Sequence, residues 1–241
     1  SNAITMMARL AKSGVMKAMN IFRQFNKETI QMINENEDHI DALADSVDNY
    51  LIRLSPHVPT GYGNDLLNYY IQCFSEFERI GDYAVNLTEN AQELKEKGVQ
   101  FSPRAQRELD ILREAIGEIL DYAYQSFAAM DAQSARRIEP IEEVVDDLVA
   151  TLRSNHIHRL REGQCTVYAG LIFLDILVNV ERIADQCSNL GVYTLAQSNA
   201  DVMKSHHDYI QYLHQGKDDF FNQEYQQKHE KYFGQLNALE D

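Results

Sequence analysis

Two stretches of the sequence place a glutamate and an aspartate four residues apart, each next to apolar sequence. FERIGDYAVNL holds Glu78 and Asp82, and VERIADQCSNL holds Glu181 and Asp185. On a helix, residues at i and i+4 are separated by only about 40° of rotation, so each pair projects from one face, one turn apart. Clustered carboxylate oxygens are the ligands that Mg²⁺, Mn²⁺, Ca²⁺ or oxidised iron take in proteins. Each stretch is therefore a candidate part of a cation site.

A second set of acidic pairs lies on other segments with helical periodicity. Glu37 and Glu142 each follow an isoleucine by four residues and precede another apolar residue by three, so they interrupt an apolar stripe. Asp41 and Asp146 follow them one helical turn later. Each half of the chain thus offers two acidic pairs at positions that could converge. The candidate metal ligands are Glu37, Asp41, Glu78, Asp82, Glu142, Asp146, Glu181 and Asp185.

The acidic pairs belong to a block that the chain contains twice. Glu78 recurs as Glu181, 103 residues further on, and Glu37 recurs as Glu142, 105 residues further on. The small difference between these offsets falls in connecting loops, where a change of length costs little. A repeat of this length predicts that the fold itself is internally duplicated.

The spacing of the apolar residues predicts the elements that must position these side chains. Apolar residues recur at steps of three and four, which indicates helices, and only 11 glycines and 4 prolines occur among 241 residues, too few turn formers for an all-β fold. The predicted fold is all-α, with two tandem three-helix bundles over residues 4–99 and 100–198 and a helical C-terminal extension over 199–241. The helices are expected at about 5–25, 27–55 and 64–97, then at 103–129, 131–161 and 165–198.

Individual residues predict where several of these helices begin and end. The clearest break runs from Ser55 to Gly63 and holds two of the prolines. Gly98 should end a helix, because glycine adopts the left-handed conformation of a helix C-terminus at little cost. Ser102 and Asp131 are expected to be N-caps. Pro140 predicts a kink or a helix start nearby, because proline cannot donate a backbone hydrogen bond.

The charge of the chain narrows the range of partners. It carries 37 acidic and 22 basic residues, a formal net charge of −15. A surface of this kind repels phosphate backbones, so we expect no nucleic-acid partner. The longest apolar run, LIFLDILVNV, is too short to cross a bilayer and contains Asp175.

Three explanations for the repeated carboxylates stay open. They could form a solvated acidic face, as most acidic residues on helices do. They could pair with Arg79 and Arg182, although these arginines point about 100° away from the adjacent glutamates and would have to serve the other helix. They could bind a cation. A partly buried carboxylate without a partner costs several kcal/mol, and the pattern recurs in both halves, so we favour the cation.

A redox or hydrolytic enzyme is disfavoured. A di-iron oxidase of the ferritin type needs Glu-x-x-His on two helices, and the chain contains no Glu-x-x-His. The eight histidines also lack the spacings of zinc sites, and we expect them on the surface. The sequence therefore predicts a binding protein without a catalytic residue.

The duplicated unit resembles the PhoU family of phosphate-signalling proteins. The stretches FERIGD, VERIAD, NENEDHIDAL and IEPIEEVVDDL carry this resemblance, which covers about residues 5–198. It implies two three-helix bundles that bind clusters of metal ions, with iron, zinc or manganese as candidates. The implied ligands are Glu78, Asp82, Glu181 and Asp185, completed by Glu37 or Asp41 and by Glu142 or Asp146.

The C-terminal segment HHDYIQYLHQGKDDFFNQEYQQKHEKYF, residues 206–233, is similar to the end of sodium/phosphate cotransporter-type membrane proteins. This similarity implies the cytoplasmic regulatory domain of a sodium-dependent phosphate transporter, placed at the cytoplasmic face of the membrane. The expected partners are a transporter domain, either an N-terminal part of the same protein or a separate one, and a second copy of the chain in a homodimer. The alternatives are a stand-alone PhoU-like adaptor that represses phosphate-uptake signalling and a carboxylate-bridged metal enzyme.

Overall fold

The computed structural model describes residues 2–54, 62–198 and 206–239, and the fold there is all-α, as predicted. None of the helices in these ranges combines the length and the apolar character that a bilayer crossing needs. In chain order the helices are α1 (Asn2–Ile21), α2 (Lys27–Leu54), α3 (Tyr62–Lys97), α4 (Pro103–Ala129), α5 (Ala132–Arg136), α6 (Ile138–Arg161), α7 (Val167–Ser198), α9 (His206–His214) and α10 (Asp219–Asn237).

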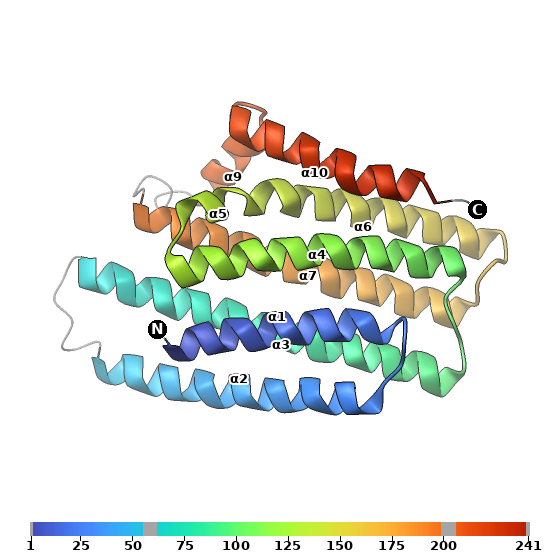
Figure 1. Cartoon of the computed structure of the whole chain (residues 1–241), viewed down its shortest axis with the longest axis horizontal. Coiled ribbons are helices and arrows are strands. Elements are labelled where there is room, and N and C mark those ends of the chain that lie inside the picture. Colours follow the sequence, from blue (N-terminus) through green and yellow to red (C-terminus); the bar gives the residue numbers. More distant parts are fainter. Residues whose placement is uncertain (1, 55–61, 199–205, 240–241) are drawn as a thin grey trace.

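The helices form the two predicted three-helix bundles (Figure 1). In the first bundle α1, α2 and α3 pack on one another, and in the second bundle α4, α6 and α7 do so, with the short α5 against α4 and α7. The apolar residues predicted to face inward are buried. Ile33 and Ile80 are at most 1% exposed, and their counterparts Ile138 and Ile183 are 0% exposed. The duplication in the sequence is therefore a duplication of packing.

The bundles join through their long third helices, α3 and α7, and through α1 and α4 (Figure 1). A polar ladder crosses the α3–α7 contact. Asn86 donates to Asn179 at 3.4 Å, and Asn90 donates to Asp175 at 2.7 Å. The buried apolar residues of both bundles form one continuous core. The two repeats are thus halves of one packed unit.

Most of the predicted helix ends are observed. Gly98 follows α3 with φ +63°, and the Val99 amide donates to the Leu94 carbonyl at 3.1 Å, which closes the C-terminus. The Ser102 side chain accepts from the Ala105 amide and caps α4. Asp131 caps α5. Residues 55–61, which hold most of the break predicted at Ser55 to Gly63, lie outside the described residues.

The segment expected to be helical over 131–161 is divided into two helices, and the helix start predicted near Pro140 is confirmed. α5 ends at Arg136 and α6 begins at Ile138. Pro140 explains the break, because its ring would clash with the carbonyl of Arg136 in a continuous helix and it has no N–H to donate. The first helix also ends at Ile21 rather than near residue 25. Its last turn closes with the Arg23 and Gln24 amides on the Asn20 carbonyl.

The two described C-terminal helices pack on the second bundle. α10 lies along α6 and α4 (Figure 1). Glu118 of α4 anchors it through hydrogen bonds from Lys228, Lys231 and Tyr232. α9 packs through Tyr209 and Ile210 on a small apolar cluster of Ala135, Val192, Leu195 and Ala196 at the end of α5 and α7. The helical extension predicted after residue 198 is present from residue 206, and residues 199–205 lie outside the described ranges.

Candidate metal centres

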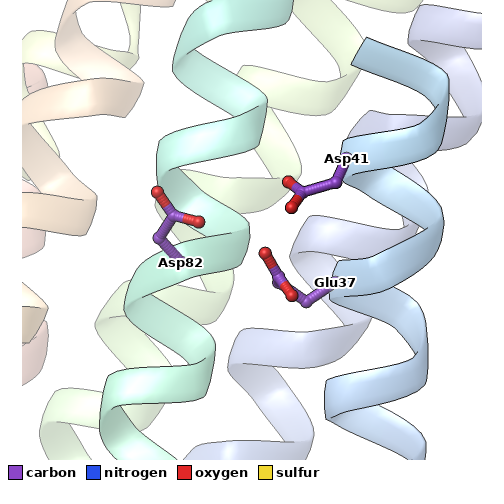
Figure 2. Close-up of side chains that lie close together, drawn as sticks. All are labelled: Glu37, Asp41 and Asp82. Carbon is purple, nitrogen blue, oxygen red and sulfur yellow. The ribbon is translucent and has the colours of Figure 1, made fainter. Parts of the chain in front are cut away.

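The first candidate site lies between α2 and α3. Glu37 and Asp41 project from α2 toward Asp82 on α3 (Figure 2). One carboxylate oxygen from each residue lies within 4.8 Å of the others, and in the described part of the chain this is the only group of three potential ligands that meets this distance. The i, i+4 spacing of Glu37 and Asp41 places both on the face of α2 that packs against α3. Helix packing has therefore brought three of the predicted ligands together.

Glu78, the fourth predicted ligand of the first bundle, lies one turn before Asp82 on α3 and is partly buried. It is not a member of the close group. Its pKa is raised mainly by burial and then by the negative charges of Asp82 and Asp41. Glu78 therefore feels the negative charge of Asp41 and Asp82 but lies at the edge of the cluster.

The first cluster is under electrostatic strain. Burial, followed by the neighbouring Asp41 carboxylate, raises the pKa of Glu37 to about 7. Burial and Asp41 also raise the pKa of Asp82. Across the described residues, no lysine or arginine forms an ion pair with any of the four carboxylates, and Arg79 pairs with Glu76 at 3.5 Å instead. Arg79 therefore acts on Glu78 and Asp82 only through its charge, and a bound cation or solvation of the exposed Asp41 and Asp82 would offset the remaining repulsion.

The second candidate site is a groove of about 660 Å³ between α6 and α7, with α9 at its rim. We call it the α6–α7 groove. The lining acidic residues are Glu139, Glu142, Glu143, Asp146 and Asp185, and His207 and His214 contribute from α9. Glu142 is only 7% exposed, and burial together with Glu139 and Asp146 raises its pKa to about 10. The groove collects more acidic side chains than the first cluster.

Several polar groups in the groove lack partners. Glu142 makes no hydrogen bond or ion pair with any described residue. The buried atoms Oδ1 of Asp146 and Oε1 of Gln186 also accept no hydrogen bond there. Burial, followed by Glu181 and Asp185, raises the pKa of Asp146 to about 7. Orphaned buried oxygens are rare in folded proteins, and a bound cation is one group that satisfies them.

Arginines distinguish the second cluster from the first. Arg153 of α6 lies 3.2 Å from Glu181 of α7, and Arg182 lies 3.4 Å from Asp185 on its own helix. The alternative in which Arg182 serves the other helix is not observed among the described ion pairs, where Arg182 pairs with Asp185. Glu181 does not line the groove. It lies close enough to α6 to pair with Arg153 and to raise the pKa of Asp146.

Residues that were not predicted from the sequence as ligands also line or contact the α6–α7 groove. His214 Nε2 lies 2.9 Å from Glu139 Oε1 and 3.4 Å from Glu143 Oε2, and the Ser188 hydroxyl donates to Glu139 Oε2 at 2.5 Å. The i, i+4 spacing of Glu139 and Glu143 was a readable signal for a further acidic pair. No local signal connects them to His214, which belongs to a helix packed against them from a distant part of the chain.

The expectation that all histidines lie on the surface is also wrong. His156 is 1% exposed and stacks on Phe173 with ring centroids 4.6 Å apart. Its ring fills the core of the second bundle beside the buried pair of Glu108 and Arg159, which are joined at 2.7 Å. A periodic pattern predicts which face of a helix is buried, but it does not decide whether a single histidine at the edge of that face is buried or exposed.

The two clusters suit cation binding on the chemistry of their donors. Both offer carboxylate oxygens on facing helices, both hold carboxyl groups whose pKa values are raised by burial and mutual repulsion, and the groove contains orphaned oxygens. A cation of charge two or three removes the repulsion and supplies the partner that these oxygens lack. The residues present therefore fit a metal ion.

Comparison with known proteins places this arrangement among its relatives. A protein-family model described as the PhoU domain matches residues 4–91 and 109–194. The phosphate-specific transport system accessory protein PhoU homolog 1 of Thermotoga maritima is 23% identical over 194 residues, which is 78% of this chain and 80% of that protein. The PhoU accessory protein of Serratia marcescens is 25% identical over 189 residues, covering 76% of this chain and 75% of that protein.

Two solved structures share the fold. The crystal structure of PhoU from Pseudomonas aeruginosa superposes with a TM-score of 0.77 at 21% identity, over 83% of this chain and 95% of that chain. A phosphate transport system regulatory protein PhoU from Streptococcus pneumoniae gives a TM-score of 0.72 at 18% identity, over 83% and 94%. At these identities the likeness establishes the two-bundle fold.

These relatives correct one functional expectation. We expected the cytoplasmic regulatory domain of a sodium-dependent phosphate transporter. This is wrong, because the matching proteins are named as accessory proteins of phosphate-specific transport systems and match over most of their own length. The expectation depended on residues 206–233, which lie outside the region that the family model matches. The alternative of a stand-alone adaptor agrees with the relatives.

Proposed function

Because the chain belongs to the PhoU domain family, we propose that it is an accessory protein of a phosphate transport system and that it acts by binding metal ions in two carboxylate clusters. The role is regulatory and requires no catalytic step. The partner is a phosphate transporter made of separate chains, met at the cytoplasmic face of the membrane. The acidic surface, with a net charge of −15, suits a basic face on that partner.

One observation carries the proposal most directly. Glu37, Asp41 and Asp82 converge from two helices to within 4.8 Å without an ion pair to any described lysine or arginine. Their like charges repel one another and contribute to the raised pKa of Glu37 and Asp82, although Asp41 and Asp82 are exposed, and a bound cation would remove this repulsion. The sequence repeat places a corresponding set in the second bundle.

In each bundle, side chains from two facing helices would hold the metal. In the first bundle Glu37 and Asp41 of α2 face Asp82 and Glu78 of α3. In the second, Glu142 and Asp146 of α6 face Asp185 of α7, with Glu181 beside Arg153 at the edge. Iron, zinc and manganese are the candidate ions, and each supplies positive charge that ties two helices together. Metal occupancy would thereby set how firmly each bundle is closed.

The experiment is a metal count by plasma mass spectrometry on protein purified without chelator. The first variant pair is Asp41→Ala with Asp82→Ala, and the second is Glu142→Ala with Asp146→Ala. Glu35→Ala is the matched control, since this exposed residue of α2 has Gln31 as its hydrogen-bond partner among the described residues. Bound iron, zinc or manganese should fall by one cluster's content in each pair and stay unchanged in the control.

A parallel measurement tests the cellular role. Phosphate uptake is compared in cells that lack the native protein and carry the wild-type chain, either variant pair or the control. We expect both variant pairs to change uptake in the same direction as loss of the protein, and the control to behave as wild type. If the variant pairs bind no metal and still regulate phosphate uptake as the wild type does, the clusters have no role in regulation.

A further inference from the structure

The sequence repeat predicts two equivalent clusters, but the C-terminal helices break that equivalence. In the described part of the chain α10 packs on α6 and α4, and α9 brings His207 and His214 to the α6–α7 groove. In the first cluster, the close group within the described residues consists of carboxylates alone. The imidazole nitrogens are thus offered to one cluster and not to the other.

His214 lies between two carboxylates of α6. Its Nε2 atom lies 2.9 Å from Glu139 Oε1 and 3.4 Å from Glu143 Oε2. Neighbouring ligands on an ion with bonds of about 2.0–2.2 Å are themselves about 3.0–3.4 Å apart. These three residues do not form a close group of ligand atoms in this structure, so a shared ion requires their side chains to rotate.

The surroundings hold His214 and Glu139 in place. The Ser188 hydroxyl orients Glu139 at 2.5 Å, and the His214 ring packs on Phe221 with centroids 5.6 Å apart. A tight corner at Gly216, with φ +72°, turns the chain from α9 into α10 directly after His214. In metal sites, hydrogen bonds and packing from surrounding residues orient the ligand side chains in this way.

Two buried side chains that line the groove have polar atoms without a partner among the described residues. Glu142 is 7% exposed without a hydrogen bond or ion pair to any described residue, and Gln186, also 7% exposed, has a buried Oε1 that accepts nothing there. Both line the groove that His214 closes. They are independent of the His214 contact and point to the same missing group.

We propose that the α6–α7 groove is a mixed nitrogen–oxygen metal site closed by α9, in which His214 supplies an imidazole ligand and Glu139 and Glu143 extend the carboxylate set. The inference rests on the proposed function, because it concerns one of the same two clusters. Imidazole favours zinc, iron and cobalt over magnesium and calcium, so the second cluster selects a softer ion than the first. Metal binding and docking of α9 stabilise each other, since each completes the other's contacts.

The test uses the full chain with the first cluster removed by Asp41→Ala and Asp82→Ala, so that bound metal reports the second. Zn²⁺ affinity is measured by calorimetry, and Co²⁺ serves as a spectroscopic probe of nitrogen ligation. His214→Gln is then added, because glutamine keeps a donor toward Glu139 but offers no imidazole. His229→Gln is the matched control, since that ring stacks on Phe233 of its own helix α10.

We expect His214→Gln to lower Zn²⁺ affinity about 10- to 100-fold and to remove the nitrogen signature from the Co²⁺ spectrum, while the control does neither. Equal affinity and an unchanged spectrum would overturn the inference and make the His214 contact an ordinary salt bridge. No Zn²⁺ or Co²⁺ in the α6–α7 groove would overturn it too. The metal count of the wild-type chain distinguishes these results from failure of the proposed function. Metal bound to the wild-type chain through the first cluster would leave the proposed function standing even if the second cluster lacked a histidine ligand.

A second readout follows α9 itself. Hydrogen exchange of the amides of α9 should slow when Zn²⁺ is added to the first-cluster variant. The change should vanish in Glu142→Ala, which leaves His214 and its contacts in place. Exchange in α9 that does not respond to Zn²⁺ in the parent variant would refute the coupling between the metal and the helix.

Discussion

Asn86 of α3 donates a hydrogen bond to Asn179 of α7 at 3.4 Å, and the repeat relates this contact to a second one across the same interface. The counterpart of Asn86 is Asn189, and that of Asn179 is Glu76, each 103 residues away. Asn189 faces Glu76 and partly offsets the rise in the pKa of Glu76 that burial causes. The asparagine of the repeated motif therefore contacts the other bundle in both copies.

This relationship predicts a loss of stability when the interface asparagine is removed. Asn179 is 7% exposed, and its amide also donates to Asn90 at 3.2 Å and to the Asp175 carbonyl at 3.1 Å. Asn179→Ala leaves buried partners unsatisfied, so we expect the free energy of unfolding to fall by about 1–3 kcal/mol. Urea denaturation measures it. Asn49→Ala, an exposed asparagine of α2, should change stability far less.

The buried ion pair of the second bundle predicts a larger effect. Glu108 is 0% exposed and accepts from both Arg159 nitrogens, at 2.9 and 2.7 Å. Arg159→Met removes both of these hydrogen bonds and leaves the buried carboxylate with Asn155 and Arg104 as its remaining described partners, so we expect a loss of about 3–5 kcal/mol. Thermal unfolding would detect it. The more exposed pair of Arg23 and Asp110 is the comparison, and Arg23→Met should cost less than about 1 kcal/mol.

The attachment of α10 predicts a dependence on pH. Burial alone would raise the pKa of Glu118, but hydrogen bonds from Lys228, Lys231 and Tyr232 outweigh it and lower the pKa from 4.5 to about 2. A lowered pKa means that the carboxylate stabilises the folded state fully above pH 4.5 and loses this contribution as the pH falls toward 2. At neutral pH the contribution is at most about 3 kcal/mol.

Glu118→Gln tests this dependence directly. The difference in unfolding free energy between the wild type and the variant should be largest near pH 7 and should shrink between pH 4.5 and pH 2. Comparing the two proteins at each pH cancels the acid sensitivity of all other groups. Exchange of the α10 amides should rise in the variant at pH 7. A difference that does not vary with pH would contradict the assigned role of Glu118.

The buried acid of the α6–α7 groove predicts a conflict between stability and binding. Glu142 is 7% exposed without a described partner, so in chelator-treated protein it destabilises the fold. Glu142→Leu should raise the unfolding free energy of metal-free protein by about 1–4 kcal/mol. The same change should abolish the stabilisation that added Zn²⁺ gives to this bundle. Destabilisation of the metal-free protein by Glu142→Leu would show that the carboxyl has a structural role instead.

Part of the candidate site was predictable from short-range pattern. The i, i+4 spacing within the segments around Glu37 and Glu78 assigns acidic residues to single helix faces, and the repeat carries the assignment to the second half. Spacing cannot give the rotation of one helix against another. That rotation brings Asp82 to Glu37 and Asp41 and leaves Glu78 at the edge.

The sequence by itself determined the all-α class, the duplication, the two three-helix bundles and most helix ends, because helical periodicity, capping and the conformational limits of glycine and proline act within a few residues. Only the tertiary structure decided how the clusters differ. Arg153 meets Glu181 from another helix, and His214 reaches Glu139 across 75 residues of chain. Such contacts depend on how whole helices pack, and no local pattern in a duplicated sequence predicts that one copy acquires partners that the other lacks.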